Sequence, residues 1–384
     1  MNELANHNER AHALLSASSS SRWLKCPPSA VAASLYPNQD TVYTREGTLA
    51  HEVAEAVVRR YVFDKHPGAP FFDNPEITSE MLACAIDYAD YIQEQIKSPD
   101  ATVLLEQRLD FSPWVPEGFG TGDCIILQGR HLDVIDYKYG QGVEVSALDN
   151  SQMRLYGLGA LNEFGSIYDI DTVTLHIFQP RKDNISVEEL TVAGLLTWGD
   201  AVRPIAAQAA VGEGEHKAGP HCRFCPHAGS CPALSGACME AYLSWGGANP
   251  DSVPSLSPRA VAEILALEGM ITAWLKAVKD RALASLMDGA EIPGYKVVAG
   301  RGSRTWADEL EMAEVLYKAG YTREEITKTE VLSPAAMEKA IGKKKVAELV
   351  AGHILSMPGA PTVAPVTDKR PVYDRLAEAK NDFA

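Results

Sequence analysis

The sequence has little of three features that would narrow its function at once. No apolar run approaches the roughly 20 residues that cross a bilayer, and the polar first twenty residues lack the apolar core of a secretory signal. Positive charge is scarce, with 35 Lys and Arg against 51 Asp and Glu, a net charge of −16. We therefore expect a cytoplasmic protein without membrane segments. The charge argues against a broad surface that coats nucleic acid, but it allows an enzyme that holds nucleic acid in one local groove.

The chain has seven cysteines, which in a cytoplasmic protein serve as thiols or metal ligands more often than as disulfides. Three of them, spaced C-x2-C-x5-C, are Cys222, Cys225 and Cys231. This spacing can wrap one metal centre and leaves one coordination position, which the distant Cys26 can fill. Zinc is an alternative, because three cysteines with His221 or His227 complete its tetrahedron. Four thiolates suit a 4Fe–4S cluster.

The order of predicted elements indicates a mixed α/β fold. Apolar periodicity predicts helices at 44–63 and 79–96, alternating strands at 101–111, 122–127 and 131–139, a helix at 150–164 and a strand at 172–179. Helices interspersed with strands in this way predict a mixed sheet covered by helices. Residues 187–211 are predicted to be helical and to lead into the cysteine run.

Composition divides the chain into three parts. Residues 1–17 are predicted to be a flexible arm and residues 18–245 one large domain. A Gly- and Pro-containing break at 246–250 separates it from a mainly helical domain at 250–384. In that domain Ser257 and Pro258 predict the start of a long helix to about residue 287. A hairpin at 295–306, further helices and an extended, Pro-rich tail are expected to follow.

The strand at 131–139 contains the sequence Asp136-Tyr137-Lys138. Side chains alternate along a strand, so Asp136 and Lys138 project from the same face. A carboxylate that holds a divalent ion beside a lysine that orients or activates water suits phosphodiester cleavage, because the lysine also offsets charge on the attacked phosphate. A simple salt bridge on a half-exposed strand is the alternative.

Other polar residues converge on the same place. A tight turn between the two strands brings Asp123 near Asp136, and two carboxylates suit Mg²⁺ or Mn²⁺. His51 can add an imidazole ligand from the first helix. Gln152 and Tyr156 lie one helical turn apart and can bond a phosphate or brace the lysine. The alternatives are a turn residue bonding its own backbone for Asp123, a buried structural histidine, and ordinary helix-surface residues.

Taken in order, these residues resemble the RecB-like branch of the PD-(D/E)xK nuclease superfamily. The matching positions, within residues 18–235, are His51, Asp123, Asp136-x-Lys138 and Gln152-x3-Tyr156. The four cysteines resemble those of its iron–sulfur subgroup, which includes AddB-type helicase-nucleases and CRISPR-associated exonucleases. The whole resembles a phage-encoded family of that type. Glu106 matches a further acidic position of the family, and Asp136 stands where many members have glutamate.

The resemblance implies a restriction-endonuclease-like fold in which His51, Asp123 and Asp136 bind Mg²⁺ or Mn²⁺ and Lys138 acts on the attacking water. It favours a 4Fe–4S cluster on the four cysteines, with Zn²⁺ as the alternative. It further implies a DNA exonuclease of phage or bacterial recombination or repair, which acts on a single-stranded end in the cytoplasm beside recombination or replication proteins. The other candidate is an inactive scaffold that binds nucleic acid or a protein partner.

Overall fold

The computed structural model describes residues 13–36, 42–66, 69–70, 72–140, 142–244, 258–326, 334, 337, 343–365 and 371–373. The chain forms two compact units, Met1–Trp274 and Leu275–Ala384. The predicted break at 246–250 lies outside the described residues. The division falls instead within helix α8 (Pro258–Met287), which runs without interruption from one unit into the other. None of the helices in the described ranges has the length and apolarity that a membrane span requires.

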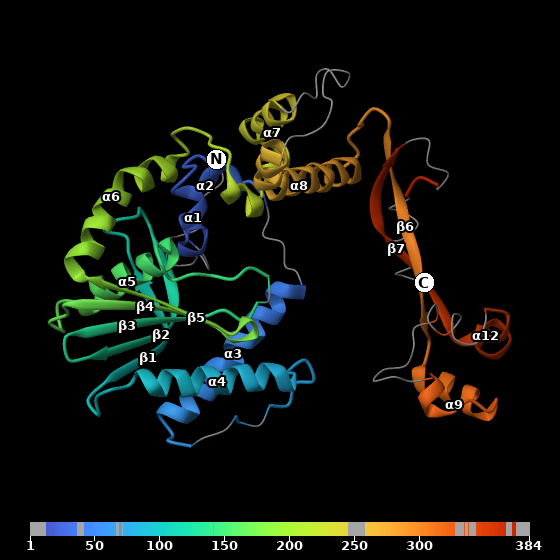
Figure 1. Cartoon of the computed structure of the whole chain (residues 1–384), viewed down its shortest axis with the longest axis horizontal. Helices are drawn as coiled ribbons and strands as arrows, with labels where there is room; N and C mark the ends of the chain where they lie inside the picture. Colours follow the sequence, from blue (N-terminus) through green and yellow to red (C-terminus); the bar gives the residue numbers. More distant parts are fainter. Residues whose placement is uncertain are drawn as a thin grey trace. The chain divides into compact units, whose positions relative to one another are not determined.

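The first unit is built on a five-stranded sheet with the order β1-β2-β3-β4-β5 (Figure 1). Its strands are β1 (Thr102–Asp110), β2 (Phe119–Gln128), β3 (His131–Tyr137), β4 (Thr172–Gln179) and β5 (Asn184–Thr191). β3 and β4 are parallel, and the other neighbouring pairs are antiparallel. A parallel pair needs a crossover connection, which helix α5 (Ser151–Phe164) supplies. The sheet is therefore mixed, as predicted.

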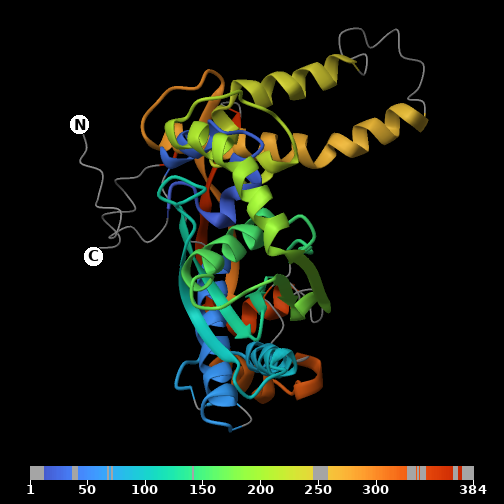
Figure 2. The same ribbon diagram turned by 90° about the vertical axis from the view of Figure 1, so that its left-hand side faces the viewer.

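Helices cover both faces of this sheet (Figures 1 and 2). On one face lie α3 (Val42–Val62) and α4 (Ser79–Gln95), and on the other α5 and α6 (Val192–Val211). Alternation along β3 divides its apolar residues between the two layers. Val134 belongs to the core with α5 and α6, whereas Ile135 belongs to the core with α3 and α4. The predicted α/β fold, a mixed sheet flanked by helices, is confirmed.

The N-terminal segment lies within the first core. Leu15 is 1% exposed and Ala17 is buried, and Trp23 Nε1 donates a hydrogen bond to the Ser16 carbonyl oxygen at 3.1 Å. The predicted flexible arm is therefore wrong for residues 13–17, because apolar side chains there find a buried site, and residues 1–12 lie outside the described part. The helical elements that follow are η2 (Ala17–Ser19), α1 (Ser20–Trp23) and α2 (Ser29–Ser34).

Beyond β4 the chain turns through η3 (Pro180–Lys182) into β5, so the prediction of helix from residue 187 is wrong for 187–191. The alternating pattern of that stretch suits an edge strand, and Thr191 then caps α6 by accepting a hydrogen bond from Gly194 N at 3.1 Å. The cysteine run follows in η4 (Pro220–Phe224), η5 (Ala228–Ser230) and α7 (Pro232–Ser244).

The second unit contains a two-stranded antiparallel sheet of β6 (Tyr295–Trp306) and β7 (Ile354–Pro365). Between them lie α9 (Glu309–Lys318), α10 (Arg323–Ile326), α12 (Lys343–Val350) and η7 (Ala351–His353). The predicted hairpin within 295–306 is wrong, because this segment is one strand whose partner lies far along the chain. Its glycines accompany irregularities of register between Val298 and Ser303 and do not form a turn. The tail predicted to be extended pairs as β7.

Candidate active site

Neighbouring strands bring two carboxylates to one end of the sheet. Cys124 of β2 pairs with Ile135 of β3, so the next positions of the ladder are Asp123 and Asp136. Asp123 Oδ2 accepts a hydrogen bond from Tyr137 N at 2.7 Å. This contact ties the two strands where their backbone ladder ends, and it fixes the orientation of the Asp123 carboxylate. The predicted proximity of the two aspartates follows from this register.

Three side chains from separate elements form a group that can hold a metal ion. His51 of α3, Glu106 of β1 and Asp123 of β2 each offer one ligand atom, and these atoms lie within 4.8 Å of one another. His51 Nδ1 is 3.4 Å from Asp123 Oδ1. One imidazole with two carboxylates is a ligand set that Mn²⁺ accepts, and the carboxylates suit Mg²⁺.

Glu106 occupies its place through an unusual backbone conformation. Its φ of 48° lies in the left-handed region, which is uncommon for a residue with a side chain. The flanking residues pair regularly, Leu105 with Cys124 and Gln107 with Gly122, so Glu106 stands opposite Asp123. Sequence reasoning did not include Glu106 among the ligands. The signal that could have done so was a charged residue inside an apolar strand, facing the strand that carries Asp123.

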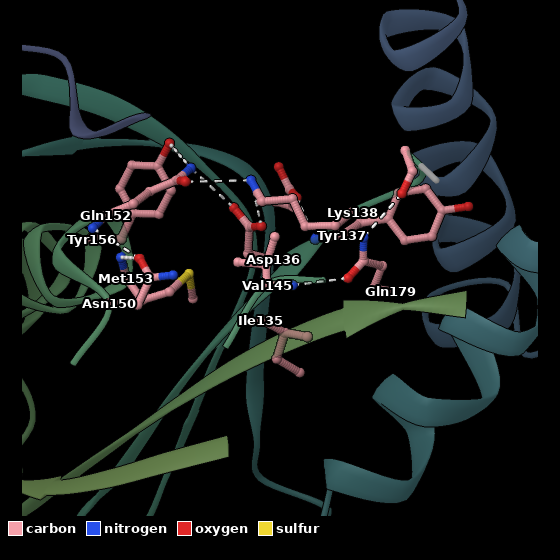
Figure 3. Close-up of polar contacts among 12 residues, drawn as sticks. Ile135, Asp136, Tyr137, Lys138, Val145, Asn150, Gln152, Met153, Tyr156 and Gln179 are labelled. Carbon is pink, nitrogen blue, oxygen red and sulfur yellow. Dashed lines mark hydrogen bonds and ion pairs between the residues drawn. The ribbon is translucent and has the colours of Figure 1, made fainter. Parts of the chain in front are cut away.

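Four further residues form a connected polar group next to this site (Figure 3). Lys138 Nζ lies 2.8 Å from Asp136 Oδ2, and the Asp136 side chain is only 4% exposed. Gln152 Oε1 accepts a hydrogen bond from Lys138 Nζ at 3.4 Å, while Gln152 Nε2 donates to Asp136 Oδ1 at 3.4 Å. Gln152 Nε2 also contacts Tyr156 OH at 3.3 Å. The structure thus brings together the residues predicted around Asp136.

The start of α5 positions Gln152. Asn150 Oδ1 caps the helix by accepting hydrogen bonds from Gln152 N at 3.0 Å and Met153 N at 3.3 Å. The crossover from β3 to β4 places this first helical turn beside the end of β3 (Figure 3). Gln152 therefore faces Lys138, and Tyr156 lies one turn further along the same side of the helix.

The buried Oδ2 of Asp136 has Lys138 as its partner. It lies 2.8 Å from Lys138 Nζ, a distance at which an ammonium and a carboxylate form a charge-assisted contact. Asp136, predicted as a metal ligand, lies outside the three-atom group of His51, Glu106 and Asp123 and is paired with Lys138.

Burial and charge shift the pKa values of the site. Burial disfavours the imidazolium of His51, but the Asp123 carboxylate outweighs it and raises the pKa of His51 to about 9. Burial and Asp123 raise the pKa of Glu106 to about 7. Burial opposes ionisation of Asp123, yet His51 and Lys138 hold its pKa below the usual range. Burial raises the pKa of Asp136 although Lys138 is adjacent.

The same balance determines the charge of Lys138. Burial disfavours its ammonium form, but the carboxylates of Asp136 and Asp123 outweigh the burial and raise the pKa of Lys138. The side chain is therefore protonated at neutral pH. At this site it acts as a cation and a hydrogen-bond donor, so the geometry supports the predicted orienting role and does not support a role as a base.

A second candidate metal centre lies elsewhere in the first unit. One pocket is lined by the four predicted cysteines, Cys26, Cys222, Cys225 and Cys231. Burial, together with the nearby thiols of the other three cysteines, raises the pKa of the Cys222 thiol, so residues far apart in the chain are close in space. Two buried atoms of lining residues, Ser29 Oγ and His221 Nδ1, have no hydrogen-bond partner within the described part of the chain. Thiols beside unsatisfied polar atoms fit a metal centre.

The pocket also contains His221 and His227. Thiolates alone suit a 4Fe–4S cluster, whereas thiolates together with one of these imidazoles suit zinc. Cys238 is buried and is not among the residues that line the pocket.

A family model described as "Protein of unknown function (DUF2800)" matches residues 12–371. The chain belongs to this family. The chain is also similar to a solved structure titled "Crystal structure of SSO0001", with 16% sequence identity and a TM-score of 0.24. That match covers 51% of this chain and 98% of the other. At such a TM-score the similarity carries no argument about fold or function.

Proposed function

We propose that the chain is a metal-dependent deoxyribonuclease, an exonuclease that hydrolyses phosphodiester bonds in phage or bacterial DNA recombination or repair. The observation that carries this proposal is the meeting of His51, Glu106 and Asp123 with the Asp136–Lys138 pair at one end of the sheet. Ligands for a hard divalent ion beside a protonated lysine are what the hydrolysis of a phosphodiester requires. The resemblance to RecB-like nucleases supports the same conclusion.

In the proposed mechanism His51, Glu106 and Asp123 hold Mg²⁺ or Mn²⁺, with Asp136 adding negative charge beside them. The bound ion supplies Lewis-acid polarisation of the scissile phosphate. Lys138 donates a hydrogen bond that orients the attacking water, and its positive charge offsets the charge that develops on the phosphate.

Gln152 and Tyr156 have a positioning role. Gln152 holds Lys138 through its Oε1 and Asp136 through its Nε2, so it sets the distance between the two charged groups. Tyr156 in turn fixes Gln152. Because the side chains are held before substrate arrives, little reorganisation is needed during the reaction.

We also propose that the four cysteines hold a 4Fe–4S cluster, with Zn²⁺ as the alternative. The pocket that the four cysteines share supports the cluster. Its role is structural, because it joins the segment of α1 and α2 to the segment of η4 and η5 and so restricts the unfolded chain. The proposal places the protein in the cytoplasm, which is the host cytoplasm if a phage encodes it, together with recombination or replication proteins.

The test uses anaerobically purified protein with Mg²⁺ or Mn²⁺ on end-labelled linear DNA and on circular DNA. We expect linear DNA to be digested and closed circles to resist. Asp136→Ala and Lys138→Ala should each reduce the rate at least ~100-fold while leaving the fold intact. Lys97→Ala, which removes an exposed lysine just beyond the C-terminal end of α4, is the matched control and should cleave like the parent. Full activity of either site variant would remove that residue from the mechanism.

The net charge of −16 favours one other function, an inactive scaffold that binds nucleic acid or a protein partner. The same preparation distinguishes the two. A scaffold would bind labelled DNA, or retain a partner, without cleaving DNA in either metal. Cleavage that depends on Lys138 would exclude it.

A further inference from the structure

A groove of about 440 Å³ lies beside the cysteine pocket and shares Arg22 and His221 with it. One wall comes from α1 and its flanking residues, including Arg22 and Lys25, and the other from η4, including His221 and Phe224. No lining residue of this groove is acidic, although the chain carries a net charge of −16. Its volume is that of a site for a ligand of nucleotide size.

Within the part of the chain that the structure describes, the cations of the groove have no carboxylate partners. Among the described residues, neither Arg22 nor Lys25 forms an ion pair, and the contact found for Arg22 Nη1 is with Cys225 Sγ at 4.0 Å. Besides burial, the positive charges of Lys25 and Arg22 help to keep the pKa of His221 below its usual range. Uncompensated positive charge in an otherwise acidic protein is the local condition for binding phosphates.

An exposed aromatic ring completes the groove. Phe224 is 76% exposed, and the guanidinium of Arg223 lies over the ring at 5.3 Å from its centroid. A large apolar side chain among cations offers a base a surface for stacking. Bases within a duplex are already stacked, so this combination selects a single strand.

The groove is connected to the candidate active site through two serines. Ser20 Oγ of α1 is 2.6 Å from Ser151 Oγ, and Ser151 is the first residue of α5. The next residue is Gln152, which contacts Lys138 and Asp136. The helix that forms one wall of the groove is thus bonded to the helix that positions the catalytic lysine.

We infer that this groove binds single-stranded DNA, with Arg22 and Lys25 on neighbouring phosphates and Phe224 stacked on a base, and that it holds the strand beside the active site. The inference rests on the proposed nuclease function for its class of substrate. It names a binding site that is separate from the metal ligands and from the cysteines.

The test measures fluorescence anisotropy of a labelled single-stranded oligonucleotide on full-length Asp136→Asn protein over a range of salt concentrations. In this background the double variant Arg22→Gln, Lys25→Gln should weaken binding at least ~10-fold and lower the salt slope by about 1.4, at about 0.7 per phosphate contact. Phe224→Ala should weaken binding about 5- to 100-fold with the slope unchanged.

The matched control is Lys97→Gln, Arg203→Gln. It removes the same charge from two exposed side chains outside the groove and should bind like the parent. Because Arg22 contacts a cysteine, metal content and melting temperature are measured for each variant. Lys25→Gln, Phe224→Ala leaves that contact in place, and it should also lose binding.

Three results would overturn the inference: groove variants with the parent's affinity and salt slope, a control that weakens equally, or a duplex of the same sequence that binds as tightly. Cleavage by the wild-type protein in Mn²⁺ is measured separately. If the wild-type protein cleaves DNA but the groove variants bind the oligonucleotide like the parent, the groove inference is wrong and the nuclease proposal stands. If binding depends on the groove but the wild-type protein does not cleave DNA, the groove inference stands and the nuclease proposal is wrong.

Discussion

Binding of Mn²⁺ should release protons in an amount that the structure sets. The pKa of His51 is about 9 and that of Glu106 about 7 in the metal-free site. Both groups must lose their protons to act as ligands. At pH 7 His51 is almost fully protonated and Glu106 half protonated, so binding should release about 1.5 protons. At pH 8 the number falls to about 1.0, because Glu106 is by then ionised.

The sign of the pH dependence follows directly. Protons compete with the metal, so affinity rises with pH, by about 17-fold between pH 7 and pH 8 for these two pKa values. Isothermal titration calorimetry in buffers of different ionisation enthalpy counts the protons. Glu106→Gln should reduce the release at pH 7 to about 1.0. Glu94→Gln, an exposed carboxylate change on α4, should leave it unchanged.

A release that does not vary with pH would refute this reasoning, as would a release that Glu106→Gln leaves intact. In the first case the ligands are not His51 and Glu106, or their protons are already lost in the free protein. In the second case Glu106 is not a ligand, and the metal lies on the Asp136 side of the site.

Three further changes test other parts of the structure. The purified protein should be brown, and Cys26→Ser should remove this colour and reduce solubility, as measured by visible absorbance and iron per chain. A colourless parent with one zinc per chain would contradict the cluster. Gly120→Ala should slow cleavage roughly tenfold or more, because the added Cβ would lie 2.7 Å from Tyr156 Cε1 and displace that ring. Cleavage at the parental rate would show that the position of Tyr156 does not matter for the reaction. Gly47→Ala in α3 should raise the free energy of unfolding by about 0.5–1 kcal/mol in a denaturant titration, because alanine favours a helix more than glycine does. Activity should not change, since nothing lies within 4 Å of the added Cβ. A loss of stability would contradict the open surroundings of Gly47.

The sequence predicts the central part of the first unit well, because alternation and a short turn are local signals. The strand pattern puts Asp136 and Lys138 on one face, and their side chains meet at 2.8 Å. The turn between β2 and β3 brings Asp123 to the same end of the sheet. The spacing of three cysteines indicates a shared centre, and Cys26 lines the same pocket.

The remaining features depend on contacts that local patterns do not encode. The strand that pairs with β6 follows it in the chain only after several helices. The glycines of β6 therefore suggest a hairpin turn in the sequence, although they lie at irregularities of register within one long strand. Residues 187–191 precede a real helix, and only pairing with β4 makes them a strand. Glu106 reaches its position because its own backbone, within β1, adopts a left-handed conformation. Leu15 is buried because it joins a hydrophobic core that distant segments of the chain build.

The two oxygens of the Asp123 carboxylate have different partners, which bears on how a bound cation would be coordinated. One oxygen, Oδ2, accepts a hydrogen bond from the amide of Tyr137, and the other, Oδ1, lies 3.4 Å from His51 Nδ1, next to another proposed ligand. With one atom each from His51 and Glu106, an octahedral ion would have half of its positions filled by the chain. Its other positions would be open to solvent molecules and to the oxygens of a phosphate group.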